Sequence, residues 1–119
     1  MTKSDLPSLR LLANNNQITY TSHATQQMLK RGIMRDEVKA VLFSPTNQLI
    51  ETQPPSKTPG KEHAEERALI SDPCAKKDIV VVVIILFNPY PEVRVVTVEY
   101  AKDEVWSKNK SVDPWLVRK

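Results

Sequence analysis

The chain has 119 residues, of which 40% are hydrophobic and 26% are charged, and its formal net charge is +3. This length suits one domain with a hydrophobic core and is too short for two comfortable ones. The strongest apolar run is about half as long as a membrane-spanning helix requires, and the N-terminal residues lack the apolar core of a signal peptide. We therefore expect a single cytoplasmic domain over residues 1–119, with no membrane segment.

A single cysteine and two histidines limit the chemistry of the chain. Cys74 cannot form an internal disulfide and has no base beside it, which is typical of a free thiol in a reducing compartment. His23, His63 and Cys74 do not follow any zinc-ligand spacing. We therefore expect neither a metal nor a cofactor. The mildly basic charge is compatible with an anionic partner without establishing one.

Three helices are predicted in the first half of the chain. Residues 5–13 form a short helix with a proline in its first turn, and a run of asparagines ends it. Residues 23–31 follow a Thr-Ser pair that supplies an N-cap, and Gly32 is a natural residue to end the helix. Residues 35–43 begin with acidic side chains, which favour the positive end of a helix, and stop before Pro45.

Extended segments follow. Residues 18–20 are a short extended piece, and residues 47–52 are predicted as the first strand. A proline-rich loop over residues 53–61 separates this strand from residues 62–71. That last segment is ambiguous, because its alanine and glutamate content favours a helix, whereas the alternation of its side chains is compatible with an edge strand.

Residues 78–87 and 92–100 are the clearest strands. Each is a run of β-branched residues with little alternation, which indicates a strand buried on both faces. The four-residue turn between them predicts an antiparallel hairpin at the centre of the sheet. The tail, residues 106–119, is polar, with two tryptophans that pack on the body and mobile last residues. This order predicts an α+β fold, with the N-terminal helices on one face of a small antiparallel sheet.

Two stretches of sequence carry a resemblance to a known family. The first, "SHATQQMLKRGIMRDEV", joins His-Ala, a methionine, Arg-Gly-Ile and an acidic helix start. The second combines "EER", an apolar strand and "VRVVTVEYA". Over residues 17–105 the chain resembles the domain of unknown function 4258 family, which is similar in layout to the BrnT and RelE toxins of bacterial toxin–antitoxin pairs.

The resemblance to these toxins implies a fold and an activity. It implies N-terminal helices on a small sheet, and this layout favours a strand for residues 62–71. It also implies a metal-independent endoribonuclease, with RNA as the substrate and a cognate antitoxin protein as a partner. Since one fold supports many functions, the layout alone does not establish the activity.

A metal-independent ribonuclease needs an acid–base group and cations that hold the scissile phosphate. Histidine suits the first role, and the planar fork of arginine suits the second. His23 lies at the start of the second predicted helix, and we expect Arg31, two turns later, along the same flank. The alternatives are that His23 packs locally and that Arg31 or Lys30 is an ordinary surface charge.

Arg67 is the centre of a second group. In the toxin-like layout a basic residue on a central strand faces the RNA groove, and His63 would share its face of the strand. The last strand adds weaker candidates. The predicted catalytic residues are His23, Arg31 and Arg67. The predicted RNA-binding residues are Lys30, His63, Arg94 and Tyr100.

Two other functions fit the same residues. One is a non-catalytic module that holds RNA on its basic face. The other is a protein-binding module that pairs a sheet edge with a partner segment. Convergence of His23, His63 and Arg67 on one concave surface would favour catalysis, and their separation would favour binding. No pattern in the sequence fixes an oligomeric state.

Overall fold

The computed structural model describes residues 1–57, 59, 65–87 and 89–119 and has an α+β fold. Its helices follow a short 3-10 turn at Lys3–Asp5 and lie within one residue of their predicted bounds. They are α1 (Leu6–Asn14), α2 (Ser22–Arg31) and α3 (Arg35–Phe43).

In the described part of the chain, the strands form one sheet of five and a separate pair, with the larger sheet in the order β1-β5-β4-β3-β2. Of the predicted strand at residues 62–71, residues 67–71 form β3, residues 65 and 66 precede it, and residues 62–64 lie outside the described residues. The strands are β1 (Ile18–Tyr20), β2 (Gln48–Gln53), β3 (Arg67–Ser71), β4 (Ile79–Leu86), β5 (Glu92–Tyr100), β6 (Trp106–Lys108) and β7 (Leu116–Arg118).

The central pairing is the predicted one. β4 and β5 are antiparallel neighbours, with Ile79 opposite Tyr100 at one end and Leu86 opposite Glu92 at the other. β2, β3 and β4 are also antiparallel neighbours. One feature of the sheet was not predicted. β1 pairs in parallel with β5, so the sheet is mixed and not purely antiparallel. A parallel pair needs a long crossover connection, and the helices and strands between β1 and β5 provide one.

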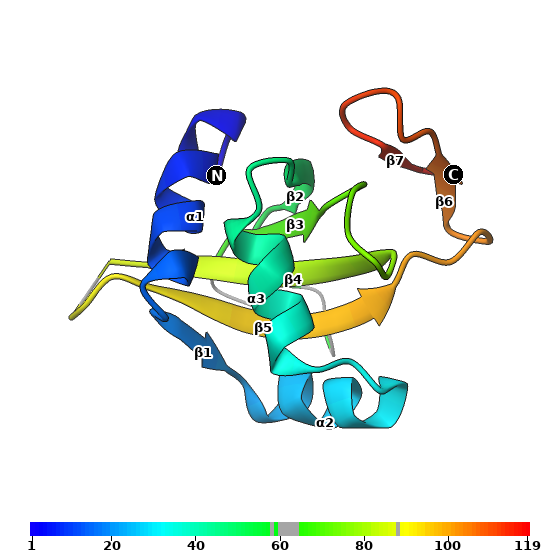
Figure 1. The fold of residues 1–119 in the computed structure, drawn as a ribbon. Helices are drawn as coiled ribbons and strands as arrows, with labels where there is room; N and C mark the ends of the chain where they lie inside the picture. Colours follow the sequence, from blue (N-terminus) through cyan, green and yellow to red (C-terminus); the bar gives the residue numbers. More distant parts are fainter. Residues whose placement is uncertain (58, 60–64, 88) are drawn as a thin grey trace.

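The helices share one core on one face of the sheet. Figure 1 shows α1 and α3 crossing this face, with α2 beside the edge of β5. Alternate residues of β4, including Ile79, Val81 and Val83, point into this core. α2 contributes Ala24 and Met28, as the helical phase predicted.

The opposite face has its own core, which confirms that β4 is buried on both sides. Val80 and Val82 pack with Trp106, Trp115 and Leu116 from the tail. The prediction of mobile last residues was wrong, because β6 pairs with β7 and Leu116 is 1% exposed. Without this cover the valines would face water, so their burial favours the ordered hairpin.

One buried polar side chain links three elements. Asn47 is 3% exposed, and its Nδ2 donates to the carbonyls of Val41 and Leu42, both at 2.9 Å. Its Oδ1 accepts from the Arg10 Nε at 2.8 Å. The last carbonyls of a helix have no partner within the helix. Asn47 therefore satisfies the end of α3 and joins it to α1 and β2.

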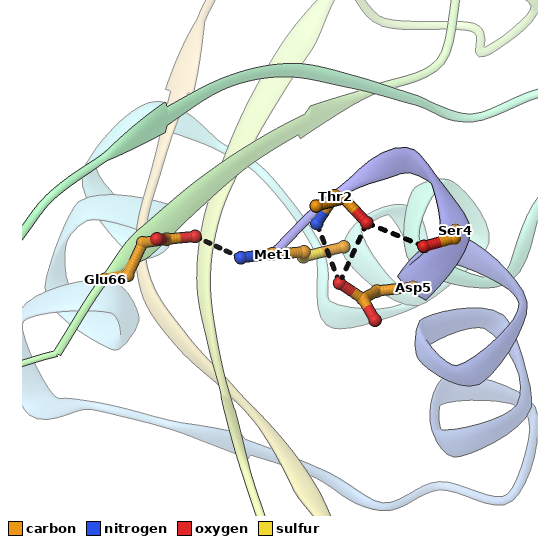
Figure 2. A network of polar contacts seen from close by, with 5 residues as sticks. All are labelled: Met1, Thr2, Ser4, Asp5 and Glu66. Carbon is orange, nitrogen blue, oxygen red and sulfur yellow. Dashed lines mark hydrogen bonds and ion pairs between the residues drawn. The ribbon is translucent and has the colours of Figure 1, made fainter.

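A polar network fixes the start of the chain against β3 (Figure 2). The ammonium of Met1 forms an ion pair with Glu66, the residue that precedes β3. The backbone N–H of Thr2 donates to Asp5 Oδ2 at 2.7 Å, and the Thr2 and Ser4 hydroxyls are 2.7 Å apart. The beginning of β3 is therefore positioned from the helical side of the sheet.

Candidate nucleic-acid interface

The α2 helix has the ends that its sequence predicted. The Thr21 Oγ1 accepts a hydrogen bond from the Ala24 N–H at 3.0 Å. Gly32 ends the helix with φ +66°, a backbone conformation that favours glycine. Ala24 and Met28 are 0% and 4% exposed against the sheet. Since this side faces the core, His23 points to solvent.

His23 and Arg31 do not share one flank of α2, contrary to our expectation. At 100° per residue, Lys30 lies within about 20° of His23 around the helix axis, whereas Arg31 lies about 80° away. His23 and Lys30 are exposed, and Arg31 is half-buried. In the part of the chain that the structure describes, the His23 imidazole has no hydrogen-bond partner.

Arg31 is engaged by the protein itself. Its Nη1 donates to the Val98 carbonyl at 2.6 Å, and the Tyr100 hydroxyl donates to the Arg31 carbonyl at 2.9 Å. At the other end of α2, the Thr21 hydroxyl donates to the Val96 carbonyl at 3.0 Å. These bonds lie along the part of the β5 edge that β1 leaves uncovered, so Arg31 and Tyr100 help to close that edge.

A row of side chains crosses the sheet on the face away from the helices. It consists of one residue from each strand in the order β2, β3, β4, β5 and β1, namely Gln53, Arg67, Ile84, Arg94 and Thr19. Arg67 is set opposite Ile84 by continuing the register of Ala68 opposite Val83 by one residue. Directly opposed residues of neighbouring strands share a face. Arg67, predicted as catalytic, and Arg94, predicted to bind RNA, therefore lie in one line, on either side of β4.

The alternation of side chains along β3 shows on which face of the sheet Arg67 lies. Leu69, two residues after Arg67, belongs to the core that the tail tryptophans cover. Arg67 must point to the same side, because side chains alternate along a strand. The β6–β7 hairpin packs on the Leu69 and Val82 part of this face. The row crosses the sheet two residues away from this covered part, at Arg67 on β3 and Ile84 on β4.

The two arginines differ in how they are held. The Nε of Arg67 is buried and has no hydrogen-bond partner among the described residues. Arg94 is exposed, and its Nη2 is 3.4 Å from Glu92 Oε1. Glu92 also accepts from the Thr19 hydroxyl. Two strand spacings separate the arginine backbones, which is roughly 10 Å.

The predicted site residues thus form two groups on different parts of the fold. The α2 group contains an acid–base side chain, but its arginine is engaged with the backbone of β5. The sheet group contains two cations and no histidine among its described residues. The groups are His23, Lys30, Arg31 and Tyr100 on one hand, and Arg67 and Arg94 on the other. His63 lies outside the described residues.

Sequence reasoning missed a second cation beside α2. The Arg35 guanidinium lies over the Tyr20 ring, with its Cζ 4.5 Å from the ring centroid. The pKa of the Tyr20 hydroxyl is raised above its ordinary value. Burial raises it most, the charge of Arg35 partly opposes this rise, and the charge of Asp36 adds to it. Thr19, Ile84 and Gln53 were also missed, because their alignment with the arginines depends on the register between strands. The residue types alone carry no signal for that register.

Among the described residues, no group of three or more His, Cys, Asp or Glu side chains could hold a metal ion. Within the same residues, no helix has the length and apolar character to cross a membrane.

No curated protein and no solved structure matches the chain. Residues 20–100, from the end of β1 through β5, match the family described as Domain of unknown function (DUF4258). Because this match covers more than half of the chain, the protein belongs to the DUF4258 family.

Proposed function

We propose that this protein binds single-stranded RNA on the sheet face away from its helices. The observation that carries the proposal is the row in which Arg67 and Arg94 flank Ile84. Arg67 also has a buried Nε that lacks a partner among the described residues. The two Nη atoms of the same side chain are not buried in this way and have no hydrogen bond among the described residues, so they can donate to phosphate oxygens.

The chemistry of the row suits a nucleic-acid strand. Arginine meets phosphate oxygens with a planar fork of donors, and its charge is permanent. Half-buried Ile84 offers apolar surface between the two cations. Gln53 and Thr19 add donors and acceptors at the two ends of the row. Single-stranded RNA presents phosphates and unstacked bases together, and a duplex does not.

Metal-independent RNA cleavage is the second candidate. Its support is the exposed His23, whose imidazole has no partner in the described part of the chain. Binding comes first because His23 belongs to the α2 group and the two arginines belong to the opposite face. The sequence resemblance to the BrnT and RelE toxins would also imply an antitoxin protein, and such a partner would compete with RNA if it covered the row.

The binding test uses a fluorescently labelled, mixed-sequence single-stranded RNA and anisotropy titrations at several salt concentrations. Arg67→Gln and Arg94→Gln remove one charge each and keep a polar side chain. Each should weaken binding and lower the slope of log K against log salt by about 1. Lys102→Gln is the matched control, because it removes a charge from an exposed residue outside the row. Equal slopes for all three variants, or no binding by the wild type, would overturn the proposal.

The cleavage test uses the same RNA in the presence of a chelator. Cleavage by the wild type that His23→Ala abolishes would establish the second candidate and place the reaction near α2. Intact RNA, together with salt-dependent binding, would leave the protein as a binding module. If neither binding nor cleavage occurs, the protein-binding function is the one that survives.

A further inference from the structure

A cavity of about 480 Å³ lies between α3 and the loop that joins β3 to β4. Its volume is within the range of sites that hold small molecules. Val41 and Ile79, both 1% exposed, line its inner part, and Phe43 and Pro45 add further apolar walls. The cavity lies on the helical side of the sheet, so it is separate from the row of arginines.

Asp72 is a buried carboxylate in the wall of this cavity and is only 6% exposed. Its Oδ1 accepts from the Thr46 hydroxyl at 2.8 Å and from the Cys74 N–H at 2.9 Å. Its Oδ2 has no hydrogen bond or ion pair among the described residues and is not one of their buried atoms without a partner, so it keeps contact with solvent and is open to a ligand. A carboxylate oxygen that is accessible and not bonded by the protein is an acceptor for a cationic donor.

The other charges around the cavity do not neutralise Asp72. The ammonium of Lys77 is 3.0 Å from Glu37, so these two charges form a pair. Lys76 and Asp36 are exposed lining residues of opposite sign. The lining therefore carries three carboxylates and two ammonium groups, which leaves one negative charge in excess. The chemistry that complements the cavity is therefore a cation with an apolar body.

We propose that this cavity binds a small amine, with its ammonium on Asp72 and its apolar part against Val41 and Ile79. The ammonium supplies the donors that Oδ2 lacks, and a charge-assisted hydrogen bond is stronger than a neutral one. The apolar body fills a space that the side chains of α3 and the loop leave open. This site is independent of the proposed RNA binding.

The test compares three probes with the same apolar chain, n-hexylamine, n-hexanol and n-hexanoate. Each is titrated into the ¹⁵N-labelled protein, and the amide shifts of residues 40–45 and 72–77 are followed. The amine should bind roughly tenfold or more tightly than the alcohol, and the carboxylate should bind least. Equal affinities for the amine and the alcohol, or no shifts with the amine, would overturn the proposal.

Two variants locate the effect. Asp72→Asn keeps the Oδ1 acceptor for Thr46 and Cys74 but removes the charge, so it should abolish the preference for the amine. Glu104→Gln makes the same charge change at an exposed residue elsewhere and should leave the preference unchanged. An unchanged preference in Asp72→Asn would refute the assignment.

Ala40→Trp provides a second measurement that does not depend on Asp72. Ala40 is an exposed residue in the wall of the cavity, so a larger side chain there should fill the space without disturbing the core. Binding of hexylamine should be lost. The exposed Cys74 also lines the cavity, and bound hexylamine should slow its reaction with a thiol reagent. Full binding by Ala40→Trp, or an unchanged thiol rate, would contradict this location.

Discussion

Replacing Arg31 with alanine should destabilise the fold, although arginine at a helix end is usually dispensable. The side chain is half-buried and donates to the Val98 carbonyl at 2.6 Å. Hydrogen bonds with a charged partner contribute about 1.5–3 kcal/mol, and loss of the donor also leaves a carbonyl without a partner. Partial exposure lets water replace part of that bond. We therefore expect a loss near the lower limit, about 1.5 kcal/mol.

Urea unfolding followed by circular dichroism measures this loss, and a thermal scan should show a midpoint lower by roughly 5 °C. His23→Ala is the matched control, because His23 is on the same helix and its exposed side chain has no partner in the described residues. Its unfolding free energy should change by no more than about 0.5 kcal/mol. Equal stabilities for the two variants would show that the bond from Arg31 to β5 does not hold the edge of the sheet.

Three further changes probe the packing, the buried polar link and the acid dependence. Met28→Ala should cost about 2–4 kcal/mol in urea unfolding, because Met28 is 4% exposed and its loss leaves a cavity; a cost under about half a kcal/mol would contradict the burial. Asn47→Ala should cost about 2–4 kcal/mol, since two carbonyls at the end of α3 lose their donor, and a neutral result would mean that water replaces it. The pKa of Glu37 is lowered, first by the Met34 N–H and then by Lys77. Its contribution to stability is therefore present above the ordinary pKa of 4.5 and is lost as the pH falls through the lower folded pKa. Wild-type protein should lose more stability than Glu37→Gln between pH 5 and pH 3, and parallel curves would argue against this role.

Local sequence patterns were sufficient to predict the helices and the two central strands. The caps of α2 and the phase of Ala24 and Met28 follow from residues within one helix. The run of β-branched residues in β4 indicated burial on both faces, and both cores confirm it. In each case the sequence pattern and the structural element cover the same short stretch of chain.

Features that depend on distant backbone atoms could not be predicted in this way. β1 is only three residues long, and its partner Val93 is far along the chain. Arg31 bonds to a backbone carbonyl, and every residue has one, so the sequence cannot mark Val98 as the partner. The tryptophans of the tail were predicted to pack on the body and they close the second core, but the pairing that orders the last residues joins two short strands that carry no local pattern.

The order in which the chain is synthesised gives that second core a further consequence. Val80 and Val82 emerge before the tryptophans and Leu116 that cover them. At a translation rate of 5–20 residues per second, these valines wait about 2–7 s for their cover. During that interval the nascent sheet presents an apolar face, which is a surface for chaperones or for other nascent chains. Slow translation between residues 83 and 115 should therefore lower the soluble yield without any change in the sequence.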